Sequence, residues 1–416
     1  MSPISPAPET VTISHGSAAV VSLGWELQPR NSAGRGPVST LRPSCVKIAH
    51  MDHVTLGHRV ARAREDAGIP QSKLAELVDM ERTALVRAEK GERKLAMTEM
   101  VAIAEALRRP LAFFVNEPLP AVVSRRSDSA RPDETSRALD DEIELFASDT
   151  RTLLDMGLLH PVKRDQEART PHTHQDAEQL ARHVRDQLDI GNEPVHHLAH
   201  VCERLGLYTY AASLGENGPD GGCVEVSHGV AVAVVNGHVR SGRRRMTLAH
   251  ELGHWLCGDA YDGSPGDDHE KMIMSFAIHF LAPRAGVVKV WNEHSEWSTR
   301  DRALAVGAQF RLSWKAAVGQ LKNLDLISYE VFQSLLDHEP RHGDYVRLEL
   351  SWDDEPKCPY LSPGFAAACV EGYTSGRLTA ARTIELLRAT MTRDDLPERE
   401  TESLASLRTL FAVGGD

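Results

Sequence analysis

The chain has 416 residues, of which 41% are hydrophobic, and a formal net charge of −12. This length predicts two or three domains with tails, and the acidic balance argues against a protein that coats nucleic acid through excess positive charge. No apolar run reaches the roughly 18 residues that span a bilayer, no secretion signal opens the sequence, and the six cysteines are scattered, so we expect a cytoplasmic protein with reduced thiols and no membrane partner.

The N-terminal part of the sequence changes character twice. Residues 1–50 are rich in Pro, Ser and Gly and show no sustained period, so we predict a disordered tail. Residues 51–117 follow a helical pattern in short pieces, and residues 118–137 return to Pro, Ser and charge, which is typical of a linker. One compact helical domain is therefore expected between a tail and a linker.

Within this domain, residues 56–115 have the pattern of a helix-turn-helix. Gly68 ends a first helix, a second helix begins at Gln71, and a third covers 82–90 with Gly91 as its C-terminal cap. The inward face of the second helix is expected to consist of Leu74, Ala75, Leu77 and Val78.

The later helix of such a module enters the major groove of DNA, while flanking polar groups contact phosphates. The candidates for base contacts are Arg82, Thr83 and Arg87. The candidates for phosphate contacts are Gln71, Lys90, Arg93 and Lys94. The alternative is an interaction module without a DNA role, because acidic and basic residues balance over 51–117. Segment 56–115 resembles the XRE/Cro/C1-type helix-turn-helix family over nearly all of its length, and the resemblance implies DNA binding and self-association as a homodimer.

Residues 138–335 predict a second domain of mixed structure. A long helical period covers 138–157, and "DAEQLARHVRDQLDI" and "PVHHLAHVCERLGL" predict two amphipathic helices. The β-branched segments "YTYAASL" and "GCVEVSHGVAVAVVNG" predict a small antiparallel sheet. Further helices are expected near 269–283, 300–308 and 313–324. Residues 336–416 are expected to form a helical C-terminal region with a role in packing or dimerisation.

The segment "RRRMTLAHELGHWLCGD", residues 243–259, contains the pattern His-Glu-x-x-His. Positions four apart share one face of a helix, so His250 and His254 can present two imidazoles to one metal ion. Glu251 is one residue further round, near enough to take a proton from water without binding the metal, as in zinc hydrolases. Gly253 is expected to leave room beside the metal. The alternative, a coincidence, has weight in a chain with 20 histidines.

A catalytic zinc ion needs a third protein ligand and an open position for water. Glu270, in "HEKMIMSFAIHFLAPR", is the candidate, because a second helix could bring its carboxylate to the two histidines. The rival ligands are Asp268, His269 and His279. The pair His196 and His200 is also four apart, but it has no intervening glutamate, and we interpret it as structural or solvent-facing.

Together, "RRRMTLAHELGH" and "EKMIMSFAIHFLAP" resemble the two motifs of the ImmA/IrrE family of metallopeptidases, over about residues 175–330. The resemblance implies a zincin-like domain with one catalytic Zn²⁺, held by His250, His254 and Glu270, and with Glu251 as the general base. It also implies an endopeptidase that cleaves a partner repressor or regulator in a stress, mobile-element or toxin–antitoxin response.

Two features fall outside this resemblance. Ile273 and Met274 stand where the family usually has Ala-Asn or Ala-Asp beside the glutamate ligand. The motifs also do not identify the group that would stabilise the oxyanion, for which the candidates are Tyr208, Tyr210, His228 and Arg243.

The expected fold is α+β and mostly helical. It comprises an all-α helix-turn-helix domain, a zincin-like α+β metallopeptidase domain with a small antiparallel sheet, and a helical C-terminal region. The expected function is that of a DNA-binding zinc-dependent endopeptidase that regulates transcription. The alternative is a transcriptional regulator or antitoxin that keeps a catalytically silent peptidase fold as a sensor or dimer platform.

Overall fold

The computed structural model describes residues 53–107, 109, 111–115, 134–163, 170–258, 267–351 and 354–399, with two short strands at 25–26 and 42–43. The chain divides into two compact units, Met1–Glu117 and Pro118–Asp416. Strands β1 (Trp25–Glu26) and β2 (Arg42–Pro43) pair antiparallel. The rest of the predicted tail at 1–50, and the predicted linker as far as residue 133, lie outside the described residues.

Within its described residues, the first unit contains five short helices. They are α1 (His53–Asp66), α2 (Gln71–Leu77), α3 (Arg82–Glu89), α4 (Met97–Ala106) and α5 (Leu111–Val115). Gly68 and Gly91 follow α1 and α3 with φ of +65° and +71°, a left-handed conformation that glycine adopts without strain. Gly57 lets α1 approach α3, because a Cβ atom there would lie 2.1 Å from the carbonyl oxygen of Ala88.

The α2 helix shows where the sequence pattern was too broad. Leu74, Ala75 and Val78 are buried as predicted, but the inward placement of Leu77 is wrong, since it is 52% exposed. The helical period of 3.6 residues places Leu77 outside the arc that the other three share. Fewer residues of α2 therefore face the core of the unit than the run of apolar residues predicted.

The second unit is also largely helical within its described residues. Its helices are α6 (Glu134–Asp155), α7 (His174–Gln187), α8 (Leu198–Arg204), α9 (Ser241–Cys257), α10 (Asp267–Leu281), α11 (Arg284–Glu293), α12 (Thr299–Gln309), α13 (Trp314–Asn323), α14 (Tyr329–Leu336), α15 (His342–Arg347), α16 (Pro363–Thr374), α17 (Ala380–Leu386) and the short 3-10 helix η1 (Arg393–Asp395). The predicted fold class, α+β and mostly helical, is confirmed.

Four strands form one sheet in the order β4-β5-β3-β6. They are β3 (Leu207–Ala212), β4 (Gly221–Ser227), β5 (Val230–Asn236) and β6 (Tyr360–Leu361). The β4–β5 and β3–β6 pairs are antiparallel, but β3 and β5 run parallel. The sheet is therefore mixed rather than antiparallel as expected. The cause is that the chain crosses from β3 to the far edge before the β4–β5 hairpin turns back, which inserts β5 between β4 and β3.

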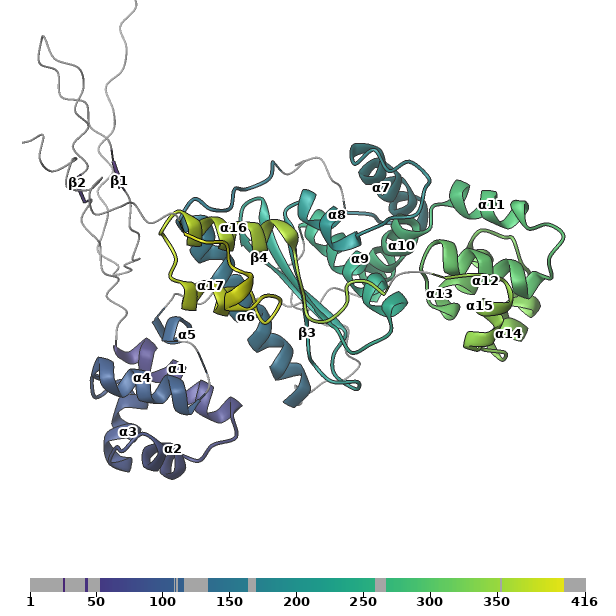
Figure 1. Ribbon diagram of the computed structural model, residues 1–416. Helices are drawn as coiled ribbons and strands as arrows, with labels where there is room; N and C mark the ends of the chain where they lie inside the picture. Colours follow the sequence, from purple (N-terminus) through teal and green to yellow (C-terminus); the bar gives the residue numbers. More distant parts are fainter. Residues whose placement is uncertain are drawn as a thin grey trace, which may run out of the picture. The chain divides into compact units, whose positions relative to one another are not determined.

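Different helices cover the two faces of this sheet (Figure 1), and each face has its own core. Successive strand residues point to opposite faces, so Leu207 and Ala211 of β3 enter one core while Tyr208 and Ala212 enter the other. The first, which we call the α9 core, contains buried residues of α7 to α14. The second, the α6 core, is covered by α6, α16 and α17. The C-terminal helices α16 and α17 thus belong to the core on the face of the sheet opposite α9.

Among the described residues, no single helix is long and apolar enough to cross a membrane. One bent pair of helices, Asp268–Leu281 with Arg284–Glu293, meets the criteria of length and composition together. Apolar residues of both helices, including Phe276, Phe280 and Val287, are buried in the α9 core.

Candidate metal centre

Helix α9 carries the His-Glu-x-x-His pattern through the middle of the α9 core. The helix ends at Gly258, whose φ of +74° is left-handed. Leu248 and Leu252 are fully buried, and Trp255 is 1% exposed and donates a hydrogen bond to the carbonyl of Leu205 at 2.8 Å. Because a close-packed core restricts rotamers, the polar side chains of this helix are held in fixed directions.

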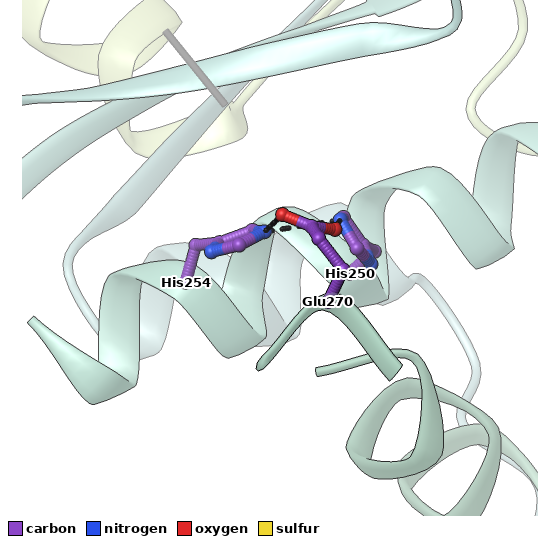
Figure 2. Close-up of side chains that lie close together, drawn as sticks. All are labelled: His250, His254 and Glu270. Carbon is purple, nitrogen blue, oxygen red and sulfur yellow. Dashed lines mark hydrogen bonds and ion pairs between the residues drawn. The ribbon is translucent and has the colours of Figure 1, made fainter. Parts of the chain in front are cut away.

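His250 and His254 lie one turn apart on this helix and meet near their Nε2 atoms (Figure 2). These two atoms are 3.0 Å apart, and the ring planes cross at 77°. Zinc–nitrogen bonds of about 2.0–2.1 Å place two ligand atoms of one ion roughly 3.0–3.5 Å apart. The separation of the two imidazoles therefore suits a shared ion.

Glu270 reaches both histidines from α10 (Figure 2). Its Oε2 atom lies 3.2 Å from Nε2 of His250, and its Oε1 atom lies 3.4 Å from Nε2 of His254. Within the described part of the chain, these three side chains form the group able to hold a metal ion. Burial acts to raise the pKa of Glu270, but hydrogen bonds and electrostatic attraction from the two histidines together outweigh burial and lower this pKa.

Glu251 is a buried carboxylate beside this group. It is fully buried, and neither of its carboxylate oxygens has a hydrogen-bond partner in the described part of the chain. Burial raises the pKa of Glu251, although His250, His254 and the thiol of Cys223 act to lower it. A buried carboxylate without partners is costly unless water or an ion supplies them. The residues present therefore fit a metal ion with a water molecule beside it.

Gly253 brings α9 and α10 together, which corrects the role expected for it beside the metal. A Cβ atom there would lie 2.9 Å from Cγ2 of Ile273 and 2.9 Å from Cδ1 of Phe276. Ile273 is fully buried and fills the space over the glycine. The apolar residue at position 273, which departs from the family pattern, thus keeps α10 close to the metal-motif helix.

The rival ligands lie outside the group. Asp268 is exposed and forms an ion pair within its own helix, and His279 faces Gln320, with its Nδ1 atom 3.3 Å from the amide nitrogen. The ring of His269 is closer, with its centroid 6.0 Å from that of His254. Glu270 is therefore the residue that α10 contributes.

The side chains considered for oxyanion stabilisation are directed elsewhere. Tyr208 and Tyr210 belong to the α6 core, on the face of the sheet opposite α9. Arg243 forms an ion pair with Asp220 at 2.6 Å, and His228 is exposed between β4 and β5. None of the four lies with the group of His250, His254 and Glu270.

In the first unit, five of the seven candidates for DNA contact are exposed. They are Arg82, Thr83, Arg87, Lys90 and Lys94. The first three belong to α3, the second helix of the helix-turn-helix pair, and Lys90 follows it as its C-cap. Solvent-facing residues on this helix are in a position from which DNA can be reached.

The other two candidates have partners inside the unit. Gln71 donates a hydrogen bond of 2.7 Å to Glu89, whose carboxylate also binds the buried Arg64 at 2.6 Å. Arg93 makes two hydrogen bonds, of 3.0 and 2.7 Å, to Glu99. Gln71 therefore links α2 to α3, and Arg93 links the turn after α3 to α4.

The sequence patterns did not indicate an ion pair between a buried residue of α9 and a residue far along the chain. Arg245 is fully buried and forms an ion pair with Glu355, 110 positions further along the chain. The run Arg243–Arg245 was the available signal, since it places charge on a helix that is otherwise buried. The sequence did not indicate Glu355 as the partner of Arg245, because residues so far apart in the chain share no local pattern.

The fold and the site define a protein with one helix-turn-helix unit and one metallopeptidase-like unit. Residues 60–114 match the helix-turn-helix family, and residues 202–322 match the peptidase family described as the IrrE N-terminal-like domain. The chain therefore combines an XRE-type helix-turn-helix domain with an IrrE-like domain, which confirms the architecture that the resemblances implied.

No curated protein matches the chain. Among solved structures, the chain is similar to the apo form of the competence regulator ComR from Streptococcus vestibularis. The likeness covers 86% of this chain and 97% of that chain at 12% identity, with a TM-score of 0.15. A score at this level carries no argument about fold or function.

Proposed function

We propose that this protein is a DNA-binding, zinc-dependent endopeptidase that regulates transcription by cutting a partner repressor or regulator. The observation that carries the proposal is the convergence of two imidazoles and one carboxylate beside the fully buried Glu251. The matches to a helix-turn-helix domain and to a peptidase family support the two halves of the proposal.

The residues of the site divide the chemistry among them. His250, His254 and Glu270 would hold one zinc ion, which supplies the Lewis acidity that lets water attack a peptide carbonyl near neutral pH. Glu251 accepts the proton of the attacking water and returns it to the leaving amine. Burial fixes the Glu251 carboxylate, and the contact of Gly253 with α10 keeps Glu270 in reach of the histidines.

The helix-turn-helix unit would bring this activity to DNA. Arg82, Thr83 and Arg87 would contact base edges from α3, while Lys90 and Lys94 would contact phosphates. Gln71 and Arg93 would reach DNA only by exchanging the partners that they have within the unit. Recognition of paired half-sites, which the XRE resemblance implies, makes a homodimer the proposed binding form.

Co-expression with candidate substrates tests the enzymatic half. The wild-type chain and Glu251→Gln are each produced with regulators encoded beside the gene, and the regulators are examined for a new cleavage product. The proposal expects a product with the wild type and none with Glu251→Gln. Identical fragments with both chains would contradict the proposed cleavage. The absence of any fragment with the wild type would contradict it as well.

A second candidate is a transcriptional regulator or antitoxin that uses a catalytically silent peptidase fold as a sensor. It is favoured by the placement of Tyr208 and Tyr210 on the opposite face of the sheet, which leaves the oxyanion without either of these donors. The two candidates differ in the effect of Glu251→Gln on regulation in cells. A silent sensor keeps its regulatory output with this variant, whereas a peptidase loses it.

A further inference from the structure

A buried arginine ties the connection between α7 and α8 to α10, the helix that carries Glu270. Arg185 of α7 donates from Nε to the carbonyl of Gly191 at 2.6 Å and from Nη2 to the carbonyl of Glu193. Its remaining group, Nη1, donates to the carbonyl of Phe280, in the last turn of α10. We call residues 191–197 the anchor loop, and through Arg185 it holds the helix that carries Glu270.

A second buried arginine ties the same loop to the other helix of the site. Arg245, in the first turns of α9, donates from Nη2 to the carbonyl of Val195 at 2.8 Å. It lies five positions before His250 on one continuous helix. The two helices that supply the metal ligands are therefore fixed to one loop, each through a guanidinium group that is at most 1% exposed.

Glu355 completes this arrangement from the C-terminal part of the chain. Its Oε1 atom binds Nη1 of Arg245 and, at 2.6 Å, Nη1 of Arg311. Its Oε2 atom accepts a hydrogen bond of 3.0 Å from the backbone nitrogen of His197, in the anchor loop. Burial lowers the pKa of Arg245 only to about 10, so its guanidinium is charged at neutral pH. A buried charge of this kind needs an ionised partner, and Glu355 is that partner.

We propose that Glu355 is a positioning residue for the metal centre. By holding Arg245 against the anchor loop, it fixes the first turns of α9 and sets His250 and His254 at the correct place relative to Glu270. This role rests on the proposed metal site, but it adds a residue outside 202–322, the range that matches the IrrE-like family. The peptidase-like unit of this chain would therefore need residues near 355 to bind its ion tightly.

Titration of the full chain with Co²⁺ tests this role, because the visible absorption of bound Co²⁺ reports ligand geometry without any substrate. Three variants perturb the contact. Arg245→Met replaces the buried charge with an apolar side chain, and Glu355 keeps its ion pair with Arg311. Glu355→Gln removes the carboxylate charge. Glu355→Asp keeps that charge on a shorter side chain. We expect Arg245→Met and Glu355→Gln to weaken Co²⁺ binding about tenfold, the lower end of the roughly 10–100-fold that loss of support around metal ligands costs. The absorption spectrum of bound Co²⁺ should change with it. The Co²⁺ affinity of Glu355→Asp should lie between that of these two variants and that of the wild type.

The matched control is Asp354→Asn. Asp354 forms an ion pair with Arg244, but its side chain is 57% exposed, and Arg244 also donates to the carbonyls of Gly237 and Val239. This control should bind Co²⁺ as the wild type does. All chains are compared at a temperature at which circular dichroism shows them folded. If Glu355→Gln does not fold, the Co²⁺ affinities of Glu355→Asp and Arg245→Met test the proposal.

Two failures can be told apart. If the wild type binds Co²⁺ and the folded variants of Arg245 and Glu355 match its affinity and spectrum, the positioning role is overturned and the metal site stands. If the wild type itself binds no Co²⁺, the proposed metal site is overturned, and the positioning role falls with it.

Discussion

Two carboxylates with different surroundings lie at the centre of the candidate site. Glu270 is 35% exposed at its side chain and contacts both imidazoles, whereas Glu251 is fully buried and has no hydrogen-bond partner among the described residues. The first arrangement is that of a ligand, and the second leaves a carboxylate free to meet water. His250 and Glu251 are neighbours on α9, but their side chains leave the helix in different directions. His250 therefore meets Glu270, and Glu251 does not bind with it.

Loss of one ligand should remove most of the metal affinity. His254→Ala leaves two of three protein ligands, and the drop in zinc affinity should exceed the roughly 10–100-fold that loss of outer support costs. Isothermal titration with zinc measures it. His200→Ala is the control, because His200 is an exposed histidine of α8 outside the group. Equal affinity in His254→Ala and the control would exclude His254 as a ligand.

A residue of α3 should contribute charge to DNA binding. Arg87 is exposed in the last turn of α3, and Arg87→Ala should weaken binding to duplex DNA and lower the slope of log affinity against log salt by about 1. Fluorescence anisotropy over a series of salt concentrations measures this slope. Lys322→Ala removes the same charge from an exposed site in the second unit and should leave the slope unchanged. An unchanged slope in Arg87→Ala would argue against contact through α3.

At the scale of elements, the site depends on how closely α9 and α10 pack. The ligands come from both helices, and Gly253 permits contact with Ile273 and Phe276. Such packing is specific in shape, so an added methyl group at this point must move one helix or reorient a buried side chain.

Gly253→Ala should therefore destabilise the second unit. Overpacking costs about 1–3 kcal/mol, and the better helix propensity of alanine offsets about 1 kcal/mol, so we expect a net loss of up to about 2 kcal/mol. Chemical denaturation measures the free energy of unfolding. Gly319→Ala in α13 is the matched control: a Cβ atom there meets nothing within 4 Å, so this variant should gain up to about 1 kcal/mol. A gain of the same size at both glycines would contradict the close α9–α10 contact.

Local sequence patterns predicted the helices better than they predicted the sheet. Apolar periodicity located α10, α12 and α13 within a few residues, because a buried helical face repeats locally. The metal group followed from two short motifs. The parallel pairing of β3 with β5, the addition of β6 and the Arg245–Glu355 contact depend on segments far apart in the chain, and no local pattern encodes them.

At the scale of the whole molecule, the C-terminal region is part of the second unit's core. β6 pairs with β3, and Phe365, Cys369 and Leu386 are buried on the face of the sheet opposite α9. Arg388 adds an ion pair of 2.7 Å with Asp149 of α6. On the face of the sheet opposite α9, residues beyond 360 therefore complete the core that α6 forms with β4 and β5.

A chain that ends at residue 351 should lose cooperative folding of the second unit. It lacks β6, α16 and α17, so the α6 core would expose buried apolar side chains that each contribute about 1.5–3 kcal/mol. Differential scanning calorimetry of this chain and the full chain measures the transition. The first unit has its own core and should still melt as before. A second-unit transition at the same temperature in both chains would contradict this account.

The central claim is that the second unit holds one metal ion between α9 and α10. Metal analysis of the purified full chain after equilibration with zinc and removal of the excess tests it most directly. The account predicts one zinc ion per chain in the wild type and in Glu251→Gln, and much less than one in Glu270→Gln. A wild-type chain that retains no stoichiometric zinc would contradict it.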